Sequence, residues 1–149
     1  MINFPKNLKA SKQNVIDSLA YAKAGSFRTL IYPIQGHQCE LAMIDAMSND
    51  YTIIQATNIE DKTEHWDLKI DGRYVDVKTT AGKHATISVS LYNILGDGKK
   101  RIFPYYLAID TVYILIGVIN ETYILNHRIS SNYGGYYIPV DMIKNKNLQ

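Results

Sequence analysis

Two carboxylates and an ammonium lie close together in the segment 66–78, and their spacing suits chemistry at a phosphate. The segment predicts two short strands joined by a tight turn, with Asp67 on the first strand and Asp76 and Lys78 on the second. Because side chains alternate between the faces of a strand, Asp76 and Lys78 point the same way. Pairing across the turn brings Asp67 near them. Such a group at the end of a sheet can hold a divalent metal ion beside a phosphate.

Glu40 adds a third carboxylate from an upstream helix, which is expected over residues 37–47. It shares a face of that helix with Met43, Ile44 and Met47, so this face should point inward. A carboxylate buried there without a partner is strongly unfavourable, and Glu40 therefore needs a cation, a hydrogen-bond donor or water. The alternative is that Glu40 lies near the helix start, where its charge suits the helix dipole and its head is partly exposed.

Taken one at a time, these residues also have ordinary explanations. Asp76 and Lys78 can form a simple ion pair on an exposed strand face, and Asp67 can belong to the same polar face. Asp71 is a competing acid, but Asp-Gly is typical of a type I′ turn, which needs positive φ at both central positions. The Asp71 carboxylate would lie at the hairpin tip. The joint spacing of helix acid, strand acid, turn and acid-x-lysine favours a site.

This combination of residues resembles the PD-(D/E)XK nucleases, which include restriction endonucleases, Holliday-junction resolvases, repair nucleases and some homing endonucleases. The resemblance rests on Glu40, on Asp67, and on Asp76-Val77-Lys78, which begins nine positions after Asp67. It covers residues 37–80 closely, about a third of the chain. The chain departs from the motif at Trp66, which stands where the family has proline. The implied fold is α/β, a restriction-endonuclease-like core with a mixed central sheet flanked by helices.

The resemblance implies a Mg²⁺-dependent DNA endonuclease, a hydrolase of phosphodiester bonds, in which Mn²⁺ can substitute. Asp67 and Asp76, with the backbone carbonyl of Val77, would bind one or two metal ions, and Glu40 would complete or orient the metal shell. Lys78 would position the attacking water, lower its pKa or stabilise the charge on phosphorus. The chemistry is sound in itself, because Mg²⁺ prefers hard oxygen ligands and lysine is a compact positive charge.

Basic residues beyond the motif are candidates for DNA binding. Lys83 and His84 follow the second strand of the motif, and Lys99, Lys100 and Arg101 end a glycine-containing loop. Either group can equally be a solvated surface segment. Residues 1–76 carry 8 basic and 10 acidic groups, whereas residues 77–149 carry 8 basic and 4 acidic groups. The second half can therefore supply the basic face that a nucleic-acid partner requires.

Composition sets the class of protein. The chain has 149 residues, 46% of them hydrophobic and 20% charged, which predicts one domain over residues 1–149 with its own core. It shows no apolar run long enough for a membrane helix and no signal peptide, so we expect no membrane partner and an intracellular, cytoplasmic location. Cys39 is the only cysteine, which excludes an internal disulfide and a cysteine-based zinc site.

The elements that position these residues follow from hydrophobic periodicity and turn signals. Besides residues 37–47, we expect a helix over residues 11–24 ended by Gly25, and a last short helix over 139–143. The first helix should bury the face that carries Val15, Ile16, Leu19 and Ala20.

Strands dominate the middle of the chain. They are expected over residues 51–56, 66–70, 73–79 and 86–91, with a second hairpin formed by 112–119 and 122–126. The segment 27–32 is compatible with a strand or an entry loop. Loops are expected over residues 58–64, 96–101 and 130–136.

Several functions stay open at this level. A restriction or homing enzyme would read bases in the grooves, whereas a junction resolvase would recognise branched shape. A homodimer or higher homo-oligomer is the simple way for a small chain to cut both strands. The alternatives are a nuclease acting on RNA or single strands, and a non-catalytic nucleic-acid or protein-binding module that keeps a nuclease-like fold.

Overall fold

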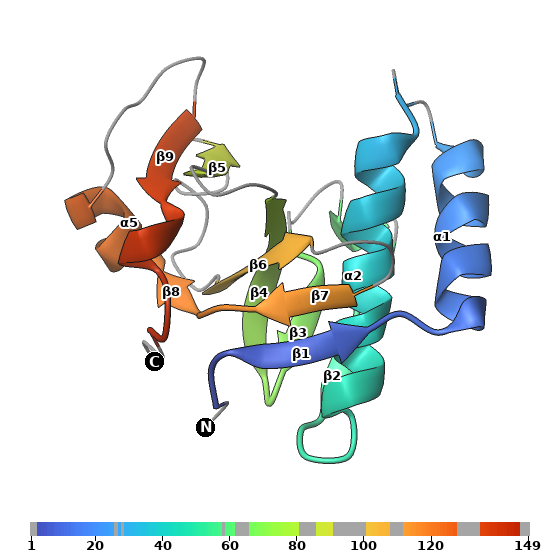
Figure 1. The fold of residues 1–149 in the computed structure, drawn as a ribbon, viewed down its shortest axis with the longest axis horizontal. Helices are drawn as coiled ribbons and strands as arrows, with labels where there is room; N and C mark the ends of the chain where they lie inside the picture. Colours follow the sequence, from blue (N-terminus) through green and yellow to red (C-terminus); the bar gives the residue numbers. More distant parts are fainter. Residues whose placement is uncertain are drawn as a thin grey trace.

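A mixed β-sheet forms the centre of the molecule (Figure 1). The computed structural model describes residues 3–25, 27, 29–57, 59–61, 66–80, 86–90, 101–107, 112–127 and 135–146. The strand order in this sheet is β1-β7-β6-β4-β3-β2, and β8 also pairs with β6. β4 and β6 run parallel, whereas the other neighbouring strands are antiparallel. The expected α/β class with a mixed central sheet is therefore confirmed.

Two strands, β5 and β9, form a separate antiparallel sheet. The strands of both sheets are β1 (Lys6–Lys9), β2 (Ile53–Gln55), β3 (Leu68–Ile70), β4 (Arg73–Thr80), β5 (Thr86–Ser90), β6 (Arg101–Leu107), β7 (Val112–Leu115), β8 (Ile119–Asn120) and β9 (Gly135–Pro139).

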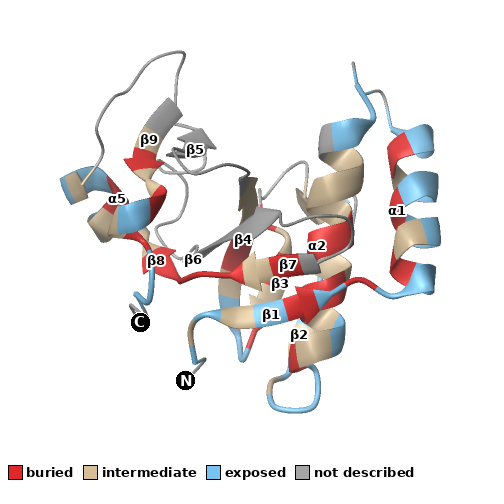
Figure 2. Cartoon of the chain, in the orientation of Figure 1, coloured by how far each residue is buried: buried red, intermediate tan, exposed pale blue. Residues whose placement is uncertain are grey.

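The main hydrophobic core lies between α2 (Ile31–Met47) and the sheet. Figure 2 shows buried residues along α2 and along the strands nearest to it. In β4, Val75 and Val77 belong to this core, so alternation turns Asp76 and Lys78 to the opposite face. The other core residues from α2, β3, β1 and β7 include Cys39, Ala42, Met43, Met47, Leu68, Ile70, Leu8, Tyr113 and Leu115.

The helix that carries Glu40 begins six residues earlier than predicted, at Ile31 instead of His37. Pro33 and Gly36 look like breakers in the sequence, but proline is tolerated in a first helical turn and a single glycine inside a helix costs only about 1 kcal/mol. The expectation of a strand or loop over residues 27–32 is therefore wrong for Ile31 and Tyr32, which are helical.

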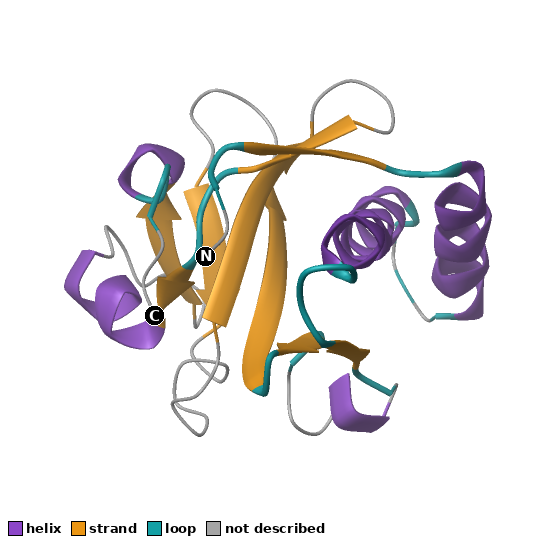
Figure 3. Ribbon diagram, turned by 90° about the horizontal axis from the view of Figure 1, so that it is seen from below, coloured by secondary structure: helices purple, strands orange, loops and turns teal. Residues whose placement is uncertain are grey.

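Helix α1 (Lys12–Ala24) matches the predicted helix, but it buries a different face. Asn14, Ser18 and Ala22 are buried, whereas Ile16 and Leu19 are 56% and 39% exposed. The reason is that α1 packs on α2 and forms an outer layer instead of covering the sheet (Figure 3). Small side chains let the two helices approach, and the Asn14 Nδ2 donates a hydrogen bond to Asp45 Oδ2 on α2, 3.1 Å away.

The β3–β4 hairpin forms around the predicted turn. Asp71 and Gly72 have φ of 47° and 79°, so both central residues are left-handed as a type I′ turn requires. The Asp71 Oδ1 accepts a hydrogen bond from the Thr52 backbone nitrogen at 2.9 Å. Asp71 therefore serves the turn and the contact of the turn with the residue before β2. This agrees with leaving Asp71 out of the candidate site.

The C-terminal part departs further from expectation. Residues 122–126 were expected as a strand, but they lie in α5 (Glu121–His127). The Asn120 Oδ1 accepts a hydrogen bond from the Tyr123 backbone nitrogen, which caps this helix, and Ile124 packs in a second hydrophobic cluster. That cluster also contains Ile116, Ile119, Ile138, Val140 and Ile143.

Smaller differences concern the ends of elements and the loops. The last predicted helix is a short 3-10 turn, η2 (Val140–Met142), that follows Pro139. Residues 59–61 are helical within the predicted loop 58–64, and Arg101 and residues 135–136 begin strands β6 and β9 where loops were expected. No helix in the described part of the chain is both long enough and apolar enough to cross a membrane.

Candidate functional site

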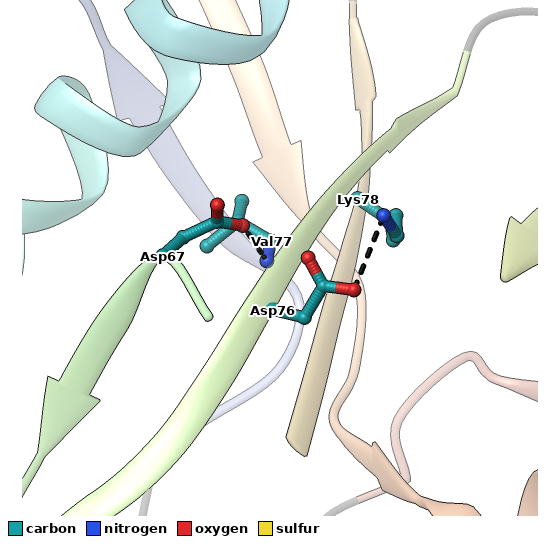
Figure 4. A network of polar contacts seen from close by, with 4 residues as sticks. All are labelled: Asp67, Asp76, Val77 and Lys78. Carbon is teal, nitrogen blue, oxygen red and sulfur yellow. Dashed lines mark hydrogen bonds and ion pairs between the residues drawn. The ribbon is translucent and has the colours of Figure 1, made fainter. Parts of the chain in front are cut away.

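Asp67 lies in a bend immediately before β3, not on the strand as predicted, and is fixed by two contacts with β4. Its backbone nitrogen donates a hydrogen bond to the Val75 carbonyl at 2.9 Å, and its Oδ2 accepts one from the Val77 backbone nitrogen at 2.7 Å. Figure 4 shows the Asp67 carboxylate against Val77, on the other side of the β4 ribbon from the Asp76–Lys78 pair. The carboxylate is therefore held at the open end of the hairpin, away from the turn.

Asp76 and Lys78 form an ion pair on the face of β4 that points away from α2. The distance between Lys78 Nζ and Asp76 Oδ2 is 3.1 Å (Figure 4). Asp76 is buried, with 5% of its surface exposed, and the Lys78 side chain is 28% exposed. The pair is thus partly withdrawn from water but still reachable.

The chain bends at Asp67, and this bend brings Glu40 into the group. Asp67 lines a small pocket together with Glu40 of α2. The preceding Trp66 ring instead meets the Tyr74 ring at a centroid distance of 5.3 Å. Tyr74 alternates with Val75 on β4 and so shares a face with Asp76. Asp67 thus shares the pocket with Glu40 and also interacts with Asp76.

The pocket has a volume of about 50 Å³ and is bordered by α1, α2, β2 and the segment after β2. It contains one acid that sequence reasoning missed, Asp61. The sequence does contain a signal for this helical turn, because Thr57 and Glu60 form a capping box at its start and Asp61 follows directly. The pocket is lined by Tyr21, His37, Glu40, Gln55, Ala56, Asp61 and Asp67.

Negative charge is crowded around Glu40. Burial raises the pKa of Glu40 to about 8, and repulsion from Asp61 and Asp76 adds to the effect, whereas the attraction of Lys78 opposes it. The alternative of a position near the helix start is therefore wrong, although Glu40 as a whole is only partly buried. Glu40 is ten residues into the helix range that begins at Ile31, deep in its middle.

Asp67 shows the same crowding. Burial raises the pKa of Asp67 well above its ordinary value, followed by repulsion from Glu40 and Asp76 and a hydrogen bond with the Asp76 side chain. The hydrogen bond from the Val77 backbone nitrogen acts in the opposite direction. The Asp67 and Asp76 carboxyl groups are thus within hydrogen-bond reach of each other.

Lys78 is held in its charged form. Burial alone would lower the pKa of Lys78, but attraction to Asp76 and Asp67 and the hydrogen bond with Asp76 raise it above its ordinary value. One ammonium faces several acidic side chains, so the group as a whole can accommodate a further cation.

A stacked aromatic pair forms the far wall of the pocket. The rings of Tyr21 and His37 lie 4.1 Å apart between centroids at an angle of 8°. Burial raises the pKa of Tyr21, helped by Asp61, and burial lowers the pKa of His37. Both rings are therefore mostly neutral near pH 7. Among the described residues, His37 Nδ1 is buried without a hydrogen-bond partner.

The described residues contain no group of three or more His, Cys, Asp or Glu side chains that could hold a metal ion. The predicted acids lie near one another, but they do not form a complete set of metal ligands. Of the predicted DNA-binding residues, Lys83, His84, Lys99 and Lys100 lie outside the described residues. Arg101 begins β6, opposite Val75 of β4, and its side chain is outside the described part.

Comparisons with known proteins add no relative. No protein-family model matches the chain, and no curated protein sequence matches it either.

Proposed function

We propose that the chain is a Mg²⁺-dependent DNA endonuclease with a restriction-endonuclease-like core. The observation that carries the proposal is the meeting of the Asp67 and Asp76 carboxylates and the Lys78 ammonium at the open end of one hairpin. Glu40 approaches the same place from α2. Two acids and a lysine in this arrangement suit the joint binding of a cation and a phosphate.

Asp67, Asp76 and the Val77 carbonyl would hold one or two Mg²⁺ ions, with Glu40 completing or orienting the shell. The donors fit such an ion, because all are hard oxygens and repulsion between neighbouring acids adds to burial in raising the pKa values of Glu40 and Asp67. Mg²⁺ keeps several of its waters and so needs few protein ligands. When bound, it would polarise a phosphoryl oxygen and activate a water, and Mn²⁺ can take its place.

Lys78 would act directly on the reacting phosphate. In the hydrolysis, water attacks the phosphorus and one bridging phosphorus–oxygen bond breaks, so negative charge grows on the phosphoryl oxygens. An ammonium that stays protonated beside Asp76 stabilises this charge and orients the water. The proton that the attacking water loses would pass to the surrounding solvent, because Glu40 and Asp67 would be occupied in holding the metal ion.

The partner we propose is DNA, bound by a homodimer that presents two such sites. A chain of this size has one group of candidate residues, and cutting both strands of a duplex or a junction then takes two copies. Lys83, His84, Lys99, Lys100 and Arg101 remain predictions for phosphate contacts.

The experiment that tests the proposal is cleavage of a substrate panel. Plasmid DNA, a four-way junction, single-stranded DNA and single-stranded RNA are incubated with the protein in Mg²⁺, in Mn²⁺ and in EDTA. We expect cleavage of DNA that needs the divalent ion and is lost in Lys78→Met. The preferred substrate then separates a junction resolvase from a site-specific enzyme.

Two results would contradict the proposal. Cleavage that persists in EDTA would exclude a metal-dependent mechanism. Failure to cut any substrate, together with calorimetry that shows no Mg²⁺ or Mn²⁺ binding in the presence of DNA, would favour a non-catalytic binding module.

A further inference from the structure

A row of three side chains crosses the sheet beside the candidate site. Ile54 of β2 lies opposite Lys69 of β3, and Lys69 lies opposite Tyr74 of β4. Directly opposed residues of antiparallel strands share a face, and Tyr74 shares its face of β4 with Asp76 and Lys78. The row is therefore on the same face as the Asp76–Lys78 pair. Ile54 is 53% exposed, so this end of the face is open to solvent.

Lys69 is held in place by two aromatic rings. Its Nζ lies 4.6 Å from the centroid of the Tyr74 ring and 5.6 Å from that of Trp66. The two rings meet edge to face, at an angle of 62°, and Trp66 is only 3% exposed. A buried tryptophan and a cross-strand tyrosine thus fix the ammonium by cation–π attraction. Trp66 stands where the nuclease motif has proline, and its contact with Tyr74 and Lys69 is a structural role for the tryptophan at this position.

The Lys69 ammonium is available to bind an anion. The Lys69 ammonium lies over the two rings, and no carboxylate of the described residues is within ion-pair distance of it. Its neighbours in the row are an isoleucine and a tyrosine, which cannot neutralise it. An ammonium that two rings hold in place, with no carboxylate of the described residues within ion-pair distance, is suited to an anion.

The distance from the candidate site indicates which anion. Tyr74 and Asp76 are two residues apart on one strand, which is about 7 Å. Charges along one nucleic-acid strand repeat every 3.4 Å of helix axis. About 7 Å corresponds to roughly two such repeats, so an ammonium at this distance from the reacting phosphate meets a nearby phosphate of the same backbone.

We infer that Lys69, supported by Tyr74 and Trp66, binds a backbone phosphate within about two positions of the one that is cleaved. This inference rests on the proposed nuclease function and assigns Lys69 as a positioning residue for the substrate strand. It has no part in the bond-breaking step. Because the rings restrict the lysine before DNA arrives, less side-chain entropy is lost on binding.

The test compares Lys69→Met with the wild type on the DNA substrate that the wild type cuts best. Cleavage rates are measured over a series of substrate and salt concentrations. We expect KM to rise about tenfold with kcat within twofold of the wild type, because one charge-assisted contact to the ground-state substrate is lost. For a duplex, the slope of log kcat/KM against log salt should become shallower by about 0.9.

Two further variants keep the result interpretable. Lys69→Arg preserves the charge and should restore most of the wild-type KM, whereas Lys23→Met removes a lysine from the far helix α1 and should leave KM unchanged. Thermal unfolding of each variant checks that it is folded; if Lys69→Met is not, Lys69→Gln is compared with Lys69→Arg. A wild-type KM and salt slope in the charge-removing variant would overturn the inference while leaving the nuclease function intact. A wild type that cuts no DNA would overturn both.

Discussion

At the scale of single residues, the central feature is uncompensated negative charge around Asp67. Strand alternation and the Asp-Gly turn are enough to predict that Asp76 and Lys78 share a face and that Asp67 lies nearby. Asp61 could not be predicted in the same way, because its place in the pocket depends on how α1, α2 and β2 meet. Strand alternation also does not predict the bend at Asp67, which places the Trp66 side chain on one face of the sheet and the Asp67 side chain on the other.

This charge has a consequence for stability that Glu40→Gln can test. The pKa of Glu40 rises from 4.5 to about 8 on folding, so the folded protein keeps a proton that the unfolded chain releases. Its contribution to stability is complete below about pH 4.5 and is lost as the pH rises through about 8. Glu40→Gln should therefore flatten the decline of the unfolding free energy across this range by up to about 1.4 kcal/mol per pH unit.

Urea unfolding in EDTA at several pH values between 5 and 8 measures the effect. Asp50→Asn, at an exposed acid after α2, serves as the matched control and should keep the wild-type decline. An unchanged pH dependence in Glu40→Gln would mean that this carboxyl is not buried among the other acids.

At the scale of elements, local signals predicted the parts whose stabilising contacts are local. The Ser11 capping box begins α1, and the positive φ values of Asp71 and Gly72 form the hairpin turn. The strands β1, β6 and β9 were missed because their partners are distant in sequence; β1, for example, pairs with β7. The apolar residues of α1 gave the wrong buried face because the helix packs on α2 instead of the sheet.

One backbone contact joins the end of the central sheet to the C-terminal segment. A Cβ added at Gly117 would lie 2.3 Å from the carbonyl oxygen of Ile143, and this backbone cannot move aside cheaply. Asn145 and Lys146 also bond to the backbone of residues 116 and 118. We expect Gly117→Ala to lower the unfolding free energy by roughly 1–3 kcal/mol. Chemical denaturation measures it, with Gly36→Ala, where the nearest atom would be 4.0 Å away, as the control.

A loss in Gly117→Ala no larger than in Gly36→Ala would show that the C-terminal segment does not pack against residue 117 as described. The contact bears on the candidate site because Ile116 and Ile143 belong to the second hydrophobic cluster. That cluster anchors β8, which pairs with the start of β6, the parallel neighbour of β4.

At the scale of the whole molecule, the candidate site lies where the two halves of the sheet meet. β4 has an antiparallel partner on one side, β3, and a parallel partner on the other, β6. The antiparallel side supplies Asp67, and α2 supplies Glu40 across the main core. Order along the chain predicted the helix and the hairpin, but the pairing of β4 with β6 is a long-range choice that sequence pattern does not reveal.

The most direct test of the central claim compares two acids of the same hairpin. Asp76→Asn removes a proposed metal ligand, whereas Asp71→Asn changes the acid of the turn, and Asn-Gly still suits a type I′ geometry. Mg²⁺-dependent cleavage of the preferred DNA substrate is measured for both variants and for the wild type, with calorimetric Mg²⁺ titration alongside. We expect cleavage to fall at least about 100-fold and Mg²⁺ binding to weaken in Asp76→Asn, while Asp71→Asn retains both. Equal activity in the two variants would contradict the central claim.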